Sequence, residues 1–84
     1  MKIKFVIVCN DMGGSYVSDC GELEVSKFEG YELFCKLYER MEGEGSECGV
    51  SEEEFYERNG EMKMGDWIVV KDNEGSEVMN FVRV

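Results

Sequence analysis

Nineteen carboxylates and four thiols dominate the chemistry available to this chain, because its sequence contains no histidine. The absence of histidine removes the Ser-His and Cys-His nucleophilic pairs and the commonest general base near neutral pH. Two carboxylates can form an acid–base pair. However, neighbouring carboxylates are expected by chance in a chain with this many acidic residues. We therefore expect a protein without catalytic activity.

The four cysteines are too far apart for a structural metal site. Cys9, Cys20, Cys35 and Cys48 are separated by 11, 15 and 13 positions, whereas structural zinc sites use closely spaced Cys or His pairs. No metal and no cofactor are expected. An even number of cysteines would permit two disulfides in a secreted protein. Because no signal segment is evident, we predict buried free thiols instead.

Two short motifs resemble ligand-binding loops but lack their essential parts. Gly13-Gly14-Ser15 has neither the lysine nor the strand-to-helix setting of a phosphate-binding loop. The segment 72–75 lacks the twelve-residue ligand spacing of a calcium loop, so a hairpin turn is the better interpretation.

Acidic residues are concentrated in one third of the chain. Residues 29–61 hold eleven of the nineteen acidic side chains and three of the nine basic ones, a net charge of −8 out of −10. The segments on either side have a net charge of −1 each. A one-signed surface attracts partners of opposite charge. The expected partner is the basic surface of another protein, without direct binding to nucleic acid or to a membrane.

Two interpretations of the acidic segment remain open. It is either a solvated surface that serves solubility, or a set of carboxylates that replace phosphates in a basic groove. Tyr56, Met62 or Met64 would add an apolar anchor to the second kind of surface, although Tyr56 is better explained as a core residue. The candidate partner-binding residues are Glu32, Glu39, Glu42, Glu44, Glu47, Glu52, Glu53 and Glu57.

The elements that must position these side chains begin with a hairpin. Residues 2–9 are rich in β-branched side chains and predict a strand, and residues 10–14 have turn chemistry. A second strand is predicted over residues 15–25. We expect a bulge in it at Cys20 and Gly21.

The middle of the chain predicts two helices. Ser26 and Glu29 match a capping box, which predicts a helix from there to about residue 41, with a possible start at Gly30. An i,i+4 ion pair is expected between Glu32 and Lys36. The expected apolar face of this helix consists of Tyr31, Phe34, Leu37, Tyr38 and Met41.

A second capping box, formed by Ser51 and Glu54, predicts a short helix that ends before Asn59 and Gly60. Residues 67–71 and 77–84 then read as two strands joined by a hairpin loop over residues 72–76.

These elements predict a single α+β domain over residues 1–84, in the order ββ-α-α-ββ. An antiparallel or mixed sheet would pack on one main helix. The longest apolar run, residues 5–9, is too short to span a bilayer or to form a signal-peptide core. A cytoplasmic protein is therefore expected.

Five residue types, Ala, Thr, Pro, His and Gln, are absent from the sequence. Every codon for these five contains cytosine, and every residue type present can be encoded without it. Ala is normally among the commonest residues, so these absences are not independent. The gene is either strongly skewed in composition, as in a phage, mobile element or symbiont, or was selected or constructed without cytosine.

The chain resembles the ubiquitin-like β-grasp fold. A hairpin ends in Leu23-Glu24-Val25, a helix follows, and Glu42-Gly43 comes at the corresponding helix end. Asn59-Gly60-Glu61 and the segment 76–84 can be laid on the same pattern. The resemblance implies an interaction adaptor or an assembly subunit. The terminal Gly-Gly that conjugated modifiers use is absent, so conjugation is not implied.

The last quarter of the chain is similar to the small phage inhibitors of uracil-DNA glycosylase, which are acidic DNA mimics. That family also ends in a Trp-led hairpin like Trp67-Ile68-Val69-Val70, with Asp72 and Gly75 in the turn. It begins with helices, whereas this chain begins with a strand. The resemblance implies an inhibitor that occupies a nucleic-acid site. We therefore expect a non-catalytic acidic binding protein, from a phage or mobile element, with an adaptor as the alternative.

Overall fold

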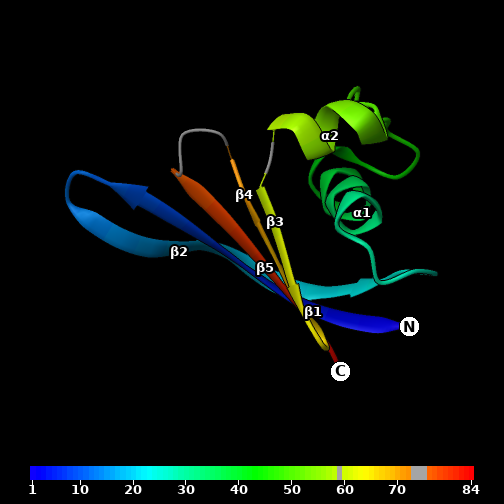
Figure 1. The fold of residues 1–84 in the computed structure, drawn as a ribbon, viewed down its shortest axis with the longest axis horizontal. Coiled ribbons are helices and arrows are strands. Elements are labelled where there is room, and N and C mark those ends of the chain that lie inside the picture. Colours follow the sequence, from blue (N-terminus) through cyan, green and yellow to red (C-terminus); the bar gives the residue numbers. More distant parts are fainter. Residues whose placement is uncertain (59, 73–75) are drawn as a thin grey trace.

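A computed structural model describes residues 1–58, 60–72 and 76–84. Figure 1 shows a twisted sheet with both helices packed near one end. Asn59, before which the second helix was predicted to end, and residues 73–75 of the predicted hairpin loop lie outside the described residues. The elements are β1 (Lys2–Asp11), β2 (Gly14–Glu24), α1 (Gly30–Glu42), α2 (Glu52–Arg58), β3 (Gly60–Met64), β4 (Trp67–Lys71) and β5 (Glu77–Arg83).

The sheet has the strand order β2-β1-β5-β4-β3, and every neighbouring pair is antiparallel. The α+β class is confirmed, and of the two predicted sheet types the antiparallel one is present. The element order differs by one strand, because β3 was not predicted. Gly, Glu and Lys have low strand propensity, and every residue of β3 is exposed. Its strand state depends on pairing with β4 at the sheet edge.

The core lies between the helices and one face of the sheet. Ile3, Phe5 and Ile7 alternate along β1 and are almost completely buried, as expected when successive side chains point to opposite faces. Phe81 from β5 and Phe55 from α2 complete the set of large, fully buried aromatic side chains. One face of the sheet is therefore covered, and the other is not.

The capping box predicted at the start of α1 does not form. Glu29 occupies the N-cap position with extended backbone and makes no side-chain capping bond. Ser26 instead donates to Glu32 Oε1 at 2.6 Å. The buried ring of Phe28 anchors this segment to the core, so the chain stays extended until Gly30. Tertiary packing thus outweighs the local capping signal.

The buried face of α1 is shifted from the predicted one. Leu37 is buried, and Tyr31 and Phe34 pack against the core as predicted, but Leu33 is also fully buried. Gly30, Leu33 and Leu37 follow i, i+3, i+7 spacing and face the sheet. Met41 is 60% exposed, so its predicted burial is wrong. The expected ion pair between Glu32 and Lys36 is also wrong: Lys36 Nζ lies 3.7 Å from Glu39.

The second predicted helix is confirmed. The hydroxyl of Ser51 accepts the backbone N–H of Glu54 at 3.2 Å, which is the N-terminal half of a capping box. The helix runs from Glu52 to Arg58 and is held to the core by Phe55.

Both predicted hairpins are confirmed, but the bulge is elsewhere. Ile7 pairs with Asp19 and Val8 pairs with Val17, so Ser18 is the extra residue. Gly21 pairs regularly with Phe5. A Cβ at Gly21 would lie 3.2 Å from the Phe5 ring and 3.0 Å from Arg40 Nη2. This glycine therefore permits close packing rather than a bulge. In the described part of the chain, no helix has the length and apolar character needed to cross a membrane.

Candidate functional site

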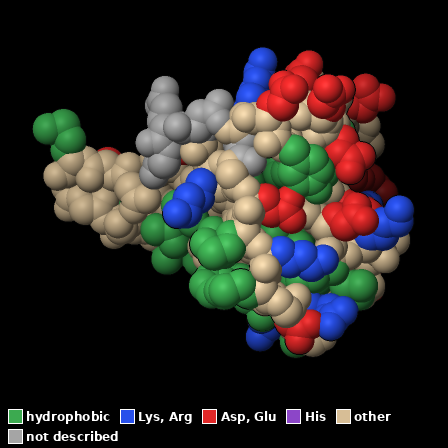
Figure 2. Space-filling model, viewed as in Figure 1, with side chains coloured by type: hydrophobic (Ala, Val, Ile, Leu, Met, Phe, Trp, Pro, Cys, Tyr) green, Lys and Arg blue, Asp and Glu red, His purple; other side chains and the backbone are tan. Residues whose placement is uncertain are grey.

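Six of the eight candidate acidic residues form an exposed set on the helical side of the molecule. We call this set the acidic surface; it consists of Glu42, Glu44, Glu47, Glu52, Glu53 and Glu57. These residues come from the end of α1, the following loop and α2. Figure 2 shows acidic side chains gathered over α2 and beside α1, whereas hydrophobic side chains gather over the strands.

The other two candidates are half-buried and have local partners. Glu32 accepts the hydroxyl of Ser26. Glu39 accepts the backbone N–H of Gly45 at 3.3 Å and lies 3.7 Å from Lys36. These contacts hold the chain at the two ends of α1. Glu32 and Glu39 therefore have structural roles in addition to their charge.

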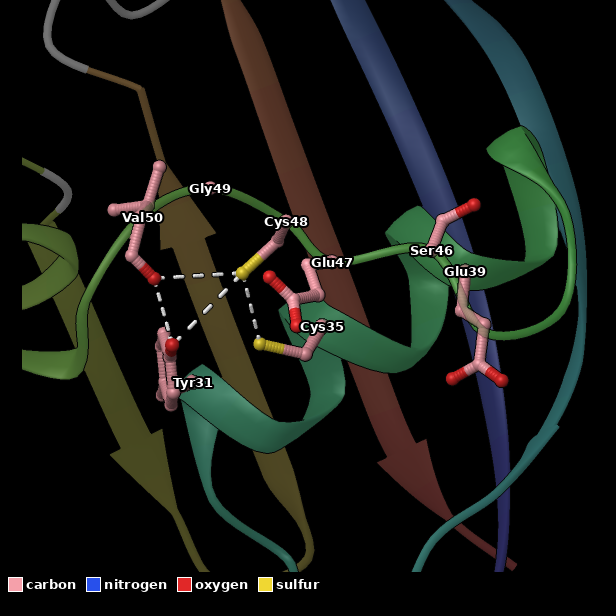
Figure 3. Close-up of a pocket in the computed structure, with 8 residues that line it drawn as sticks. All are labelled: Tyr31, Cys35, Glu39, Ser46, Glu47, Cys48, Gly49 and Val50. Atoms are coloured by element: carbon pink, nitrogen blue, oxygen red, sulfur yellow. Dashed lines mark hydrogen bonds between the residues drawn. The ribbon is translucent and has the colours of Figure 1, made fainter.

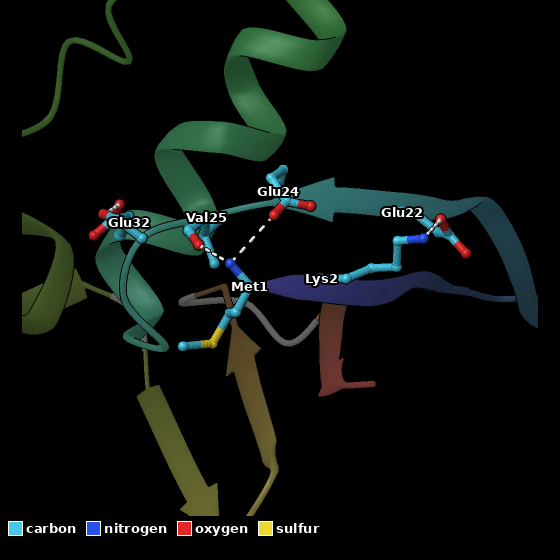
Figure 4. A network of polar contacts seen from close by, with 7 residues as sticks. Met1, Lys2, Glu22, Glu24, Val25 and Glu32 are labelled. Atoms are coloured by element: carbon cyan, nitrogen blue, oxygen red, sulfur yellow. Dashed lines mark hydrogen bonds and ion pairs between the residues drawn. The ribbon is translucent and has the colours of Figure 1, made fainter.

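Within the described residues, no member of the acidic surface forms an ion pair. The acidic residues that do form ion pairs lie outside it, for example Glu22 with Lys2 at 3.7 Å and Glu24 with the amino group of Met1 at 3.3 Å (Figure 4). Asp19 similarly pairs with Arg40, and Asp66 with Arg83. In the described structure, the six carboxylates of the acidic surface therefore have no cation beside them to offset their charge.

The loop after α1 carries two residues of the acidic surface, Glu44 and Glu47. It folds back along the helix because Gly43, Gly45 and Gly49 adopt positive φ angles of 115°, 84° and 71°, which glycine tolerates without steric cost. Gly43 donates its N–H to Glu39 O at 2.8 Å and ends the helix.

The position of α2 depends on an aromatic cluster. Phe55 contacts the rings of Tyr31, Phe34 and Tyr56, with centroid distances of 5.7, 5.1 and 5.0 Å. Three acidic residues then occupy the first turn of α2, where the positive end of the helix dipole favours negative charge.

Tyr56 has features of both roles predicted for it, the exposed apolar anchor and the core residue. It is 41% exposed, and its hydroxyl accepts the backbone N–H of Tyr31 in the first turn of α1 at 3.3 Å. Burial raises the pKa of Tyr56 above its ordinary value. The other two proposed anchors, Met62 and Met64, are exposed on β3.

A second candidate surface is the sheet face opposite the helices, which we call the open sheet face. Alternation and register place on it an apolar group: Val6, Val8, Val17, Met62, Met64, Trp67, Val69, Val78 and Val82. Its charged residues are Lys2, Lys4, Lys71, Glu22 and Glu24. The face therefore nets +1 on a molecule of −10.

Helix α1 and the loop that follows it bring together a group of thiol and hydroxyl side chains that the sequence did not predict (Figure 3). Cys35 on α1 lies 3.2 Å, sulfur to sulfur, from Cys48 in the loop. The Tyr31 hydroxyl donates to Val50 O at 2.6 Å and lies 3.8 Å from Cys48 Sγ. A surface pocket of about 390 Å³ opens beside them, lined also by Glu39 and Glu47.

All four cysteines are free thiols, as predicted, but none is fully buried. Cys20 is exposed, and Cys9, Cys35 and Cys48 are half-buried. The described residues contain no group of three or more Cys, Asp or Glu side chains suited to hold a metal ion. The signal for the Cys35–Cys48 pair was present in the glycine-rich segment 43–49, which lets the chain return to the helix that it has just left.

Burial raises the pKa of the Cys35 thiol to about 11. Burial also raises the pKa of the Cys48 thiol, but hydrogen bonding to the Val50 backbone, to Cys35 and to Tyr31 outweighs this effect, so the pKa of Cys48 falls below its ordinary value. The pKa of Tyr31 rises because its hydroxyl is hydrogen-bonded to both thiols. Cys48 is therefore the more acidic thiol of the pair.

No family model matches the chain, and no curated protein or solved structure matches it either. The resemblances to the β-grasp fold and to the uracil-DNA glycosylase inhibitors therefore remain expectations drawn from the sequence.

Proposed function

We propose that this protein is a non-catalytic acidic binding protein whose acidic surface occupies a basic groove of a nucleic-acid-processing or defence protein. An inhibitor encoded by a phage or mobile element would act in this way. The observation that carries the proposal is the exposure of six carboxylates without ion-pair partners, among the described residues, on the helical side of the domain.

The chemistry of such a surface suits a site built for phosphates. Carboxylates accept charge-assisted hydrogen bonds from Arg and Lys, as phosphates do, and Arg binds both groups with the same planar fork. The negative field speeds association with a basic groove and is screened by salt. The same field repels nucleic acid and anionic membranes, so neither is expected to bind directly.

The test replaces Glu44, Glu47, Glu52 and Glu53 with Lys. Affinity capture from the source cell at low and high salt would first supply the partner, and competition with nucleic acid for that partner would then measure affinity. We expect the fourfold variant to lose binding and the competition to weaken as salt increases. Undiminished affinity of the fourfold variant contradicts the proposal.

A matched pair of variants separates position from total charge. E44K/E47K changes the acidic surface, and E22K/E24K changes the opposite side of the molecule by the same net charge. If the two variants lose equal affinity, the effect is one of net charge and the acidic surface is not the site.

The open sheet face favours a second candidate function, an adaptor or assembly subunit. Exposed apolar side chains such as Val82 and Trp67 lie on this face, whose net charge is close to zero. Contiguous exposed apolar patches mark protein interfaces. For an adaptor, V82K in the last hairpin would abolish partner capture at both salt concentrations, and the fourfold Glu to Lys variant would bind normally. The reverse pattern supports the inhibitor.

A further inference from the structure

The pair of thiols between α1 and the following loop has a geometry that the proposed function does not use. We propose that Cys35 and Cys48 form an intramolecular disulfide on exposure to hydrogen peroxide, which joins the loop covalently to α1. This modification site is defined by the 3.2 Å contact between the two sulfur atoms, on one wall of the surface pocket (Figure 3).

The remaining distance is small. A disulfide bond is about 2.05 Å long, so the two sulfur atoms must approach by roughly 1 Å. Cys35 is held on a helix, whereas Cys48 belongs to the loop between α1 and α2. Gly49 beside it has a positive φ of 71°, and apart from its chain neighbours no described atom lies within 4 Å of where its Cβ would be. The part of the loop before Val50, which itself packs against the core, can therefore supply the movement.

The surroundings divide the roles of the two thiols. The thiolate is the nucleophile in cysteine oxidation, and Cys48 is the more acidic of the two. The Cys48 thiolate attacks one peroxide oxygen, the O–O bond breaks, and the products are Cys48 sulfenic acid and hydroxide. Cys35 sulfur then attacks Cys48 sulfur, the S–O bond breaks, and the Cys35 proton leaves with the oxygen as water. Two thiols are oxidised and one peroxide is reduced.

The charges around the pocket select the oxidant. Glu39 and Glu47 line the same pocket as the thiols, and they repel anionic oxidants such as oxidised glutathione. Hydrogen peroxide is neutral and small, so this field does not exclude it. The acidic surroundings therefore favour peroxide over a disulfide exchange partner.

The disulfide would restrain the loop that carries Glu44 and Glu47. Cross-linking removes conformations from the segment that it closes, and a surface held in one conformation binds at lower entropic cost. Oxidation would thus regulate the acidic surface. This last step alone rests on the proposed function, whereas formation of the disulfide does not.

The test uses a C9S/C20S variant of the full chain, so that only the two relevant thiols remain. After treatment with hydrogen peroxide, we expect the intact mass to fall by two hydrogen atoms and to recover with dithiothreitol. Digestion should yield one peptide pair linked through Cys35 and Cys48. Mapping the same linkage in the treated wild-type chain requires no substitution and guards against a folding defect of the variant.

Single variants in the same background test the division of roles. C35S should retain a sulfenic acid at Cys48, trapped by dimedone, and C48S should react at least about tenfold more slowly. Equal reaction rates of the two variants overturn the assignment of Cys48 as the nucleophile. If peroxide adds oxygen atoms to both thiols without joining them, or if disulfides form only between separate molecules, the proposed intramolecular disulfide is overturned.

Cleavage by a glutamate-specific protease after Glu44 and Glu47 tests the restraint. We expect at least about tenfold slower cleavage of the oxidised chain, with peroxide-treated C35S/C48S as the unlinked control. Equal cleavage of oxidised and reduced chains overturns the restraint. The two proposals can fail separately. If the disulfide forms but the fourfold Glu to Lys variant keeps full affinity for the partner, the proposed function is disproved and the disulfide site still stands.

Discussion

Individual residues in this domain often serve a neighbour in space rather than a neighbour in sequence. Gly21 leaves room for Arg40, whose guanidinium lies over the Phe5 ring at 5.0 Å and also pairs with Asp19 at 3.1 Å. One missing side chain thus permits a contact between the end of α1 and the β1–β2 hairpin. Packing of this kind depends on the exact volume available.

Substitution of Gly21 by Ala should therefore destabilise the protein. The new Cβ would lie 3.2 Å from the buried Phe5 ring, and overpacking of this kind costs about 1–3 kcal/mol. Urea denaturation measures the change. Gly60→Ala is the matched control, because apart from its chain neighbours no described atom lies within 4 Å of its added Cβ. Equal midpoints for the two variants would show that space at Gly21 is not limiting.

The pKa difference between the two paired thiols predicts different alkylation profiles with pH. Iodoacetamide reacts with the thiolate. The pKa of Cys48 lies below the ordinary thiol value and that of Cys35 is raised to about 11. As pH rises from 7, Cys48 should be alkylated first, and Cys35 should react fully only near pH 11. Peptide mass spectrometry after timed labelling measures both rates, and coincident profiles would refute the difference.

The raised pKa of Cys35 also makes the stability of the folded protein decrease at high pH. The folded state keeps the Cys35 proton to a higher pH than the unfolded state does, so the associated stability is complete below the unfolded pKa of about 8.5. It is lost as pH rises through about 11.

At the scale of elements, the two helices begin in different ways despite similar sequence signals. Ser51 caps α2, whereas Ser26 lies four residues before α1 and bonds Glu32 instead. The difference arises because Phe28 must reach the core before α1 can start, and no such residue separates Ser51 from its helix.

Ser51→Ala should cost about 1 kcal/mol, the usual value of an N-cap serine. Ser26→Ala should cost less than about 0.5 kcal/mol, because its exposed hydroxyl bonds a side chain and satisfies no helix N–H. Thermal or urea denaturation of both variants measures the difference. If Ser26→Ala lowered the free energy of unfolding by more than Ser51→Ala does, the contact of Ser26 with Glu32 would be a main stabilising interaction at the start of α1, contrary to this prediction.

The edge strand β3 is held by contacts outside its own sequence. It pairs with β4, and Lys63 donates to Phe28 O at 3.2 Å while its ammonium lies 5.6 Å from the centroid of the Phe28 ring. The strand therefore closes the side of the core next to the start of α1.

At the scale of the whole molecule, charge and apolar area are separated between two sides. The helical side bears the acidic surface, and the open sheet face is apolar with a net charge of +1. Self-repulsion among unpaired carboxylates destabilises the compact state. The fold therefore maintains the acidic surface against an electrostatic cost.

Added salt should consequently stabilise the protein. Raising sodium chloride from 0.01 to 0.5 M shortens the Debye length from about 30 Å to about 4 Å, which screens the repulsion. We expect the melting temperature to rise by several degrees, and by less in E44K/E47K. Identical salt dependence in the variant and the wild type would indicate that the acidic surface does not carry the cost.

Local sequence patterns by themselves determined the two hairpins, the short capped helix, the α+β class and the concentration of acid between residues 29 and 61. These features depend on side-chain alternation, turn residues and counts of charge, which act over a few residues. The tertiary structure alone decided the strand state of β3, which of the two predicted starts α1 takes, the contact of Cys35 with Cys48 and the separation of the acidic surface from the open sheet face. Each of these depends on which distant segments pack together, because burial and close approach are properties of the folded chain.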